Sequence, residues 1–379
     1  MKSRAIVTLA AVAVGAGFGV AHSAAASPAA DAGAGRAVFV QTNQANGNQI
    51  VVYDRAADGS LSRAGTYATG GDGAAAAPGT ETDHLASQGS LVYDAAHRLL
   101  LAVNAGSDSV SALRVHGDRL ELESVVPSGG LFPASIAVHG TLVYVLNSGG
   151  SGVAQGFRIA GHRLVRIHGS ARALGLANTD PPNFLSSPGQ IGFSPDGRQL
   201  LVTTKASEST IDVFGVRRDG RLSATPVSNP AATPVPFAFT FAPTGRLVAG
   251  EAGASTVSTY ELGSDGTLRD ARSQADGQVA LCWITRVGEH YYVSNTGSNT
   301  VSGYTIAADG QPSLVGATGV VATTEPGPID STSPPGTALL YVETGGGTVD
   351  EFTANADGTL SQLGTVADLP AGIEGIAST

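Results

Sequence analysis

The chain has 379 residues, and its 31 Asp and Glu outnumber its 21 Lys and Arg, so the formal net charge is −10. An acidic chain repels the phosphates of nucleic acids, which argues against a nucleic-acid-binding protein. A disulfide framework is also excluded, because the single cysteine, Cys282 in ALCWI, has no partner within the chain. We interpret this side chain as a small buried hydrophobe.

The first 26 residues have the pattern of a secretory signal peptide. Lys2 and Arg4 precede an apolar run from Ala5 to Val20, and small residues follow at Ala24–Ala26. This run is short for a membrane span, and no later stretch is long enough. We therefore expect residues 1–26 to be removed and the mature chain to be secreted or extracytoplasmic, without a membrane span. An uncleaved anchor is the alternative.

The next segment, residues 27–36, is rich in Ala, Gly and Pro, and we expect it to be a disordered lead-in. Residues 37–379 repeat a strand pattern and are predicted to form a single domain. The repeat is clearest in Gly189–Ser223, where Asp196-Gly197 and Asp219-Gly220 separate runs of alternating or β-branched residues. An Asp-Gly pair between such runs is typical of a β-hairpin.

A strand followed by a polar loop and a β-branched residue recurs seven times along the chain. The β-branched residues are Ile50, Val110, Val153, Ile211, Val257, Val301 and Val349, at intervals of 43 to 60 residues. Repeats of about 40 to 50 residues with four short strands each are typical of β-propeller blades. The sequence therefore predicts an all-β fold, a seven-bladed β-propeller of four-stranded antiparallel blades.

The first repeat, Ala37–Tyr67, supplies only three strands, and its innermost strand is missing. The chain end, Ala371–Ser378, has the pattern of an innermost strand with nothing after it. We predict that this C-terminal strand completes the first blade and closes the ring, so that no lateral sheet edge stays exposed.

Two segments without strand alternation, Ala68–Gln88 and Gly175–Ser187, account for the two longest intervals. Each falls between the last strand of one blade and the first strand of the next. Successive turns of a meander alternate between the two faces of the ring, so both insertions are expected on the face opposite the tight Asp-Gly turns. Because irregular loops on a rigid scaffold often carry function, we place the site on that face, over the channel.

Polar residues recur at the ends of the second strands. They are Asn43, Asn104, Asn147, Lys205, Glu251, Asn295 and Glu343, and they are predicted to form a ring on the insertion-bearing face. An Asn in such a loop also serves to bind backbone groups, which is the alternative role for the four asparagines. Lys205 is the only lysine after the signal peptide, and the predicted ring places it opposite Glu251 and Glu343. Its ammonium group is suited to binding a carboxylate or a sugar acid.

His84 is the one histidine in a long insertion, where ETDHL places it beside Glu81 and Asp83. A histidine next to a carboxylate is suited to taking a proton from water, and a solvated loop histidine is the alternative. The chain contains no HExxH, paired CxxC, GxSxG or strand-linked GxGxxG motif. The sequence therefore predicts neither a metal site nor a cofactor.

The blades read FSPDGRQLLVTTKASESTIDVFGVRRDGRLS, YVSNTGSNTVSGYTIAADGQ and LLYVETGGGTVDEFTANADGTLSQL. These sequences resemble those of the seven-bladed β-propeller lactonase family, which includes 6-phosphogluconolactonase of the propeller type and carboxymuconate cyclases. The resemblance implies a lactone or sugar-acid site at the channel mouth, without a required metal. Members of that family carry histidine just before the SPDGR strand, where this chain has Ser187–Gln190.

Two functional hypotheses follow, together with a purely structural propeller as a third, and we expect a monomer. The first is an exported lactone hydrolase, in which His84 or Glu251 activates water. Its substrate-binding residues would be Asn104, Asn147, Gln190, Lys205, Asn295 and Glu343. The second, favoured by the missing family histidine, is a non-enzymatic binding propeller that recognises a glycan, peptide or protein partner.

Overall fold

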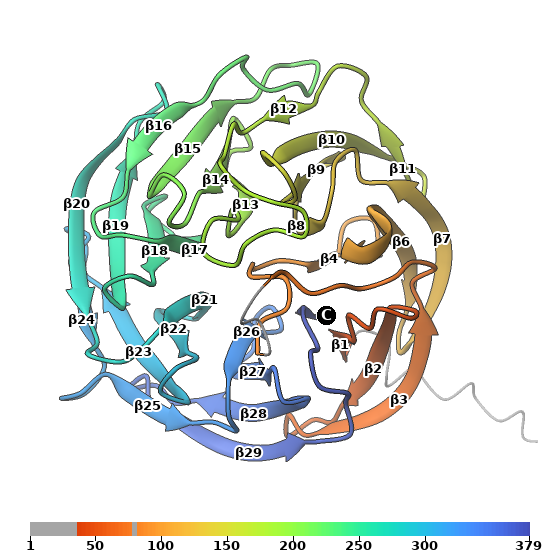
Figure 1. Cartoon of the computed structure of the whole chain (residues 1–379). Helices are drawn as coiled ribbons and strands as arrows, with labels where there is room; N and C mark the ends of the chain where they lie inside the picture. The colour runs from red at the N-terminus through yellow and green to blue at the C-terminus, as the bar shows by residue number, and fades with distance from the viewer. Residues whose placement is uncertain (1–35, 78–81) are drawn as a thin grey trace, which may run out of the picture. The chain divides into compact units, whose positions relative to one another are not determined.

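The computed structural model describes residues 36–77 and 82–379. The predicted signal peptide and nearly all of the predicted lead-in lie outside the described residues. The described chain forms seven antiparallel sheets around a central channel (Figure 1). This arrangement confirms the predicted seven-bladed β-propeller.

Each blade begins with an innermost strand at the channel and ends with an outermost strand at the rim. From the channel outward, blade 1 contains β30 (Ile376–Ser378), β1 (Ala37–Gln41), β2 (Gln49–Arg55) and β3 (Leu61–Ala68). Blade 2 contains β4 (Leu91–Asp94), β5 (Leu99–Asn104), β6 (Ser109–His116) and β7 (Arg119–Pro127), with the 3-10 turn η1 (Ala105–Ser107) after β5. Blade 3 contains β8 (Pro133–His139), β9 (Leu142–Asn147), β10 (Val153–Ala160) and β11 (Arg163–Arg166).

The remaining four blades follow the same order. Blade 4 contains β13 (Ile191–Phe193), β14 (Gln199–Thr203), β15 (Thr210–Gly215) and β16 (Val227–Pro230). Blade 5 contains β17 (Pro236–Phe241), β18 (Leu247–Glu251), β19 (Thr256–Leu262) and β20 (Leu268–Ala275). Blade 6 contains β21 (Leu281–Val287), β22 (His290–Asn295), β23 (Thr300–Ile306) and β24 (Pro312–Leu314). Blade 7 contains β26 (Pro328–Thr332), β27 (Leu339–Thr344), β28 (Thr348–Ala354) and β29 (Leu360–Val366).

The outer strand is interrupted in two blades. In blade 3, β12 (Arg172–Ala173) pairs with the beginning of β10, while β11 pairs with its end. In blade 6, β25 (Val320–Thr323) pairs with the beginning of β23, while β24 pairs with its end. Both blades therefore keep the predicted meander, with an outer strand built from two short pieces.

Burial falls steeply from the second strand of a blade to the fourth. Every residue of β5, β14 and β18 is buried, whereas β3 and β20 have exposed residues at alternate or successive positions. The second strands read as continuous apolar runs because neighbouring blades cover both of their faces. The core thus consists of layers between adjacent blades, such as the cluster shared by β5, β6, β8, β9 and β10.

The C-terminal strand closes the ring as predicted. Val38, Phe39 and Val40 of β1 pair antiparallel with Ser378, Ala377 and Ile376 of β30. The ladder continues beyond β30, because the Gln41 N–H donates to Gly375 O at 2.9 Å and the Glu374 N–H donates to Gln41 O at 3.0 Å. Residues from the two ends of the chain therefore share the first sheet.

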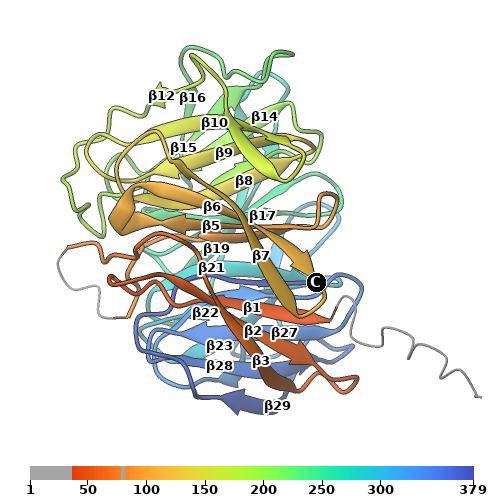
Figure 2. The ribbon, with the colours of Figure 1, turned by 90° about the vertical axis from the view of Figure 1, so that its right-hand side faces the viewer.

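The two insertions lie on the same face and contact each other, which confirms that prediction. The Ala77 N–H donates to Pro182 O at 2.9 Å, and the Phe184 N–H donates back to Ala77 O at 3.2 Å. Seen edge-on, the described part of the first insertion lies on one face of the ring (Figure 2). Among the described residues, no helix is long and apolar enough to cross a membrane.

Ring closure generates a stability prediction. Ile376 is 4% exposed and belongs to a cluster with Val38, Val40 and Tyr341. We expect Ile376→Asp to lower the free energy of unfolding by about 3 kcal/mol, because an unpaired charge would enter this apolar layer. Urea unfolding followed by circular dichroism measures the change.

The matched control is Val165→Asp, which introduces the same charge on outer strand β11, where Val165 is 53% exposed. This variant should stay within about 0.5 kcal/mol of the parent chain. Equal losses in the two variants would contradict a special role for the closing strand.

Candidate functional site

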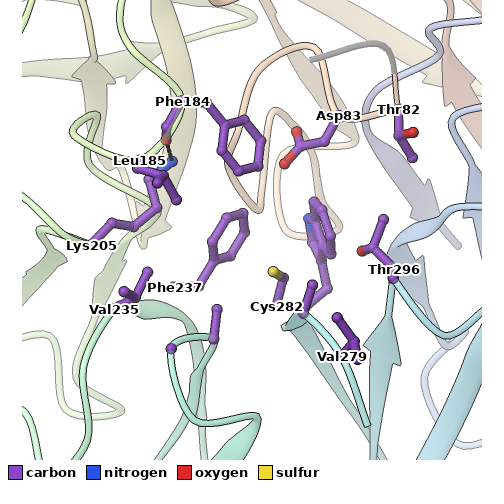
Figure 3. A pocket seen from close by; sticks show the side chains of 15 residues that line it. Thr82, Asp83, Phe184, Leu185, Lys205, Val235, Phe237, Val279, Cys282 and Thr296 are labelled. Atoms are coloured by element: carbon purple, nitrogen blue, oxygen red, sulfur yellow. Dashed lines mark hydrogen bonds between the residues drawn. The ribbon is translucent and has the colours of Figure 1, made fainter. Parts of the chain in front are cut away.

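A cavity of about 510 Å³ opens on the insertion-bearing face of the ring. Both insertions and blades 4, 5 and 6 contribute to its wall. Figure 3 shows Lys205 and Phe184 entering from one side and Asp83 from another. The lining residues are Thr82, Asp83, Phe184, Leu185, Lys205, Val235, Phe237, Ala252, Gly253, Val279, Ala280, Cys282, Trp283, Thr296 and Gly297.

Lys205 joins the two insertions through its ammonium group. Its Nζ donates to the carbonyl of Ala86 at 2.6 Å and to the carbonyl of Phe184 at 2.6 Å. The same nitrogen lies 5.0 Å from the ring centroids of both Phe184 and Phe237, within cation–π range. Within the described residues, the ammonium makes two of the three hydrogen bonds that it can donate. Lys205 therefore holds the two insertions together and is also a hydrogen-bond donor in the cavity wall.

Burial disfavours the charge on this ammonium. Lys205 is 0% exposed, and its burial lowers its pKa to about 8, although nearby Asp83 opposes the change. The lysine therefore remains mostly charged at neutral pH and loses its proton under mildly alkaline conditions.

Asp83 is the carboxyl group in the cavity wall, and the sequence did not single it out as a site residue. Its Oδ1 accepts a hydrogen bond from the Ala86 N–H at 2.6 Å, which holds the side chain beneath the first insertion. Burial raises the pKa of Asp83 to about 6, while the positive charge of Lys205 opposes this rise. A carboxyl group with a pKa raised to this value exchanges a proton close to neutral pH.

The carboxyl groups of Asp83 and Glu374 are neighbours, and each affects the pKa of the other. Asp83 Oδ2 and Glu374 Oε1 have no hydrogen-bond partner among the described residues. Burial and the charge on Asp83 raise the pKa of Glu374, so a proton held by this pair favours Glu374. The Oε2 atom of Glu374 accepts the His84 N–H at 2.9 Å, and burial raises the pKa of Glu374 well above its usual range. The segment that closes the ring therefore supports the Asp83 side chain.

Two further carboxyl groups lie buried behind this pair, in blade 7. Glu343 Oε1 accepts the Gly375 N–H at 2.6 Å, and Asp330 Oδ2 accepts the Gly89 N–H at 3.3 Å. Burial raises the pKa of Asp330 to about 7 and that of Glu343 well above the usual range. Within the described residues, no group of three or more His, Cys, Asp or Glu is arranged to hold a metal ion. The raised pKa values favour the protonated form of these buried carboxyl groups.

His84 contributes to this network mainly through its backbone. Besides the bond from its N–H to Glu374, its half-buried imidazole packs on Gly372, where an added Cβ would lie 2.0 Å from Cε1. Burial lowers the pKa of His84, so its neutral form is favoured. The imidazole is not among the groups that line the cavity, and its predicted role as a base stays a prediction.

Glu251, the other predicted base, is 0% exposed and bonded within its own blade and the loop before it. Its Oε2 accepts from the Thr233 N–H at 2.8 Å, from Thr233 Oγ1 at 2.6 Å and from Ser258 Oγ at 2.8 Å. Its Oε1 accepts from the Tyr260 hydroxyl. Both oxygens are engaged away from the cavity lining, and the catalytic role of Glu251 also stays a prediction.

The predicted asparagines likewise bind neighbouring strands and loops. Asn104 Nδ2 donates to Ser111 Oγ at 2.8 Å, and Asn295 Nδ2 donates to Ser302 Oγ at 2.9 Å, so each ties the second strand to the third. Asn147 Nδ2 donates to the Val153 carbonyl at 3.1 Å. Asn147 therefore binds a backbone group, as in the alternative role considered for these residues, whereas Asn104 and Asn295 bind side-chain hydroxyls of the third strand.

Gln190 and Glu343 complete the predicted substrate-binding set. Gln190 Oε1 accepts the Phe239 N–H at 2.6 Å, which links blade 4 to blade 5 near the channel. Glu343 belongs to the buried carboxyl network described above. Of the predicted residues, Lys205 is the one that the described cavity wall contains.

Sequence reasoning missed Asp83, Glu374 and the aromatic wall. Asp83 was visible as the neighbour of His84 in ETDHL, but the carboxyl group beside it, that of Glu374, comes from the opposite end of the chain. Trp283, the only tryptophan, stands next to the only cysteine in ALCWI. That unusual pair was a usable signal, although it equally suits an ordinary core strand.

No protein family profile matches the chain, and no curated protein matches it by sequence. Solved structures match it closely in fold. A candidate 6-phosphogluconolactonase from Bacteroides uniformis superposes with a TM-score of 0.69 at 18% identity, covering 90% of this chain and 99% of that one. The periplasmic gluconolactonase of Pseudomonas aeruginosa gives a TM-score of 0.66 at 17% identity, covering 90% and 98%. This chain therefore shares its propeller fold with these two proteins.

Proposed function

We propose that the cavity binds a small lactone and hydrolyses it to the corresponding hydroxy acid. The observation that carries the proposal is the presence of one cationic donor, Lys205, and one tuned carboxyl group, Asp83, in the same wall. Hydrolysis of an ester carbonyl needs a base for water and a donor for the developing oxyanion. The shared fold with a protein named as a gluconolactonase supports the choice of a lactone.

In the proposed reaction, Asp83 as carboxylate takes a proton from a water molecule. The hydroxide oxygen bonds to the lactone carbonyl carbon, and the negative charge moves to the carbonyl oxygen, where the remaining N–H of Lys205 stabilises it. The carbonyl then re-forms as the ring C–O bond breaks. The departing alkoxide takes the proton back from Asp83, so that one water is consumed and a hydroxy acid is released.

Glu374 acts in this scheme as a positioning residue. Its carboxyl group accepts the His84 N–H and lies beside the Asp83 carboxyl group, whose position it restricts. A base with a pKa near 6 is largely ionised at neutral pH yet still accepts a proton, which suits general base catalysis.

The first test compares three candidate bases on a panel of lactones. Asp83→Asn should lower kcat/KM by at least about 100-fold, the usual contribution of a general base, whereas His84→Ala and Glu251→Gln should keep most of the activity. Hydrolysis is followed by acid release, with the buffer rate subtracted. Preserved activity in Asp83→Asn together with loss in either other variant would assign the base to that residue instead.

The pH dependence gives a second test. Activity requires Asp83 without its proton and Lys205 with its proton, so kcat/KM should rise through about pH 6 and fall through about pH 8. Lys205→Met should lower the plateau and remove the fall on the alkaline side. A single rising limb with no decrease above pH 8 in the parent protein would contradict the role of Lys205.

Binding without turnover is the second candidate function. It is favoured by Ser187–Gln190, which stand where members of the lactonase family carry histidine. In that case the same face recognises a glycan, peptide or protein partner. A thermal shift that persists unchanged for hours in the presence of ligand, with no product formed, would support it.

We also propose that residues 1–26 direct export. The basic start, the apolar run from Ala5 to Val20 and the small residues at Ala24–Ala26 support this role.

Expression of the full chain in a bacterium should place a protein that begins near Ser27 outside the cytoplasm, as shown by fractionation and intact mass. A chain of full mass in the cytoplasmic or membrane fraction would contradict cleavage.

A further inference from the structure

The wall of the cavity is dominated by aromatic and aliphatic side chains. Phe184, Phe237 and Trp283 line it, and the rings of Phe237 and Trp283 lie 4.8 Å apart at 59°. The indole N–H of Trp283 donates to the Ser87 carbonyl at 3.0 Å, so its polar atom is already satisfied. The aromatic wall is therefore suited to an apolar ring rather than to a polyol.

The rim of the cavity is apolar as well. Leu185 is 53% exposed and Val279 is 60% exposed, and both are lining residues. Large apolar side chains exposed beside an apolar cavity are typical of a ligand-binding surface. A bound apolar group would remove these side chains from water.

Charge in the wall disfavours an anionic ligand. None of the described residues that line the cavity is arginine or histidine, and the one lysine already donates to the Ala86 and Phe184 carbonyls. Asp83 lines the cavity, and the carboxyl group of Glu374 lies beside it. A phosphate group normally needs several N–H donors or an arginine, and in this cavity it would meet one spare ammonium proton and a carboxyl group.

We infer that the cavity takes an uncharged lactone whose ring system or side chain is aromatic or alkyl, and that it discriminates against polyhydroxylated and phosphorylated sugar lactones. That the ligand is a lactone rests on the proposed function, whereas its apolar and uncharged character follows from the residues of the cavity wall alone. It also separates this chain from the activity named for its 6-phosphogluconolactonase neighbour, which it resembles in fold.

Trp283 provides a direct readout, because it is the only tryptophan in the chain and lines the cavity. Its fluorescence is titrated with dihydrocoumarin, an aromatic lactone, with D-glucono-1,5-lactone and with 6-phosphogluconate, and product formation is measured in parallel. Dihydrocoumarin should bind at least about tenfold more tightly than either sugar compound, which corresponds to about 1.4 kcal/mol.

Substitution at the rim tests the location without disturbing the core. Val279→Asp should weaken dihydrocoumarin binding at least about tenfold, because a charge replaces an exposed apolar contact. Val165→Asp adds the same charge on β11 of blade 3, outside the cavity wall, and should leave the affinity unchanged. Equal affinity in all three proteins would overturn the assignment of the cavity as the binding site.

The outcomes separate this inference from the proposed function. Tight binding of dihydrocoumarin without product would retain the ligand class and overturn hydrolysis. Hydrolysis of the sugar lactone without binding of dihydrocoumarin would retain hydrolysis and overturn the ligand class. Tighter binding of 6-phosphogluconate than of dihydrocoumarin would also overturn the ligand class, and failure of all three probes to bind would overturn both.

Discussion

The structure depends on the requirement that each blade cover the two apolar faces of its neighbours. A second strand such as β5, buried at every position, is stable only between two adjacent sheets. An open row of blades would leave one such face exposed at each end. Pairing of β1 with β30 removes both ends by building one blade from the two ends of the chain. Closure is therefore a condition for burying the core.

Closure of the ring also positions part of the candidate site. Glu374 and Gly375 immediately precede β30, where they contact His84 and Glu343 respectively. The first insertion therefore packs against the end of the chain, while Lys205 ties it to the second insertion. The cavity wall is held by contacts between segments that are far apart in sequence, which gives it a fixed shape despite its irregular backbone.

Burial of titratable groups carries an energetic cost in this arrangement. Four carboxyl groups and one ammonium group are almost fully removed from water near the channel. Burial raises the pKa of each of the four carboxyls and lowers that of Lys205, so the network tends toward neutral, proton-sharing groups. Apolar residues would fill the same space at lower cost. The retention of titratable groups beside an aromatic cavity is the feature that most favours chemistry or specific binding there.

Local periodicity and turn residues were enough to predict the number of blades, their strand order, the closing strand and the common face of the two insertions. The sequence also indicated Lys205, an isolated lysine at a strand end. The contact between Asp83 and Glu374, and the binding of Glu251 and the asparagines to strands and loops beside them, emerged only from the folded chain. Hydrogen bonds between segments nearly 300 residues apart leave no local pattern, and an Asn or Glu at a strand end looks the same whether it binds a ligand or a neighbouring hydroxyl.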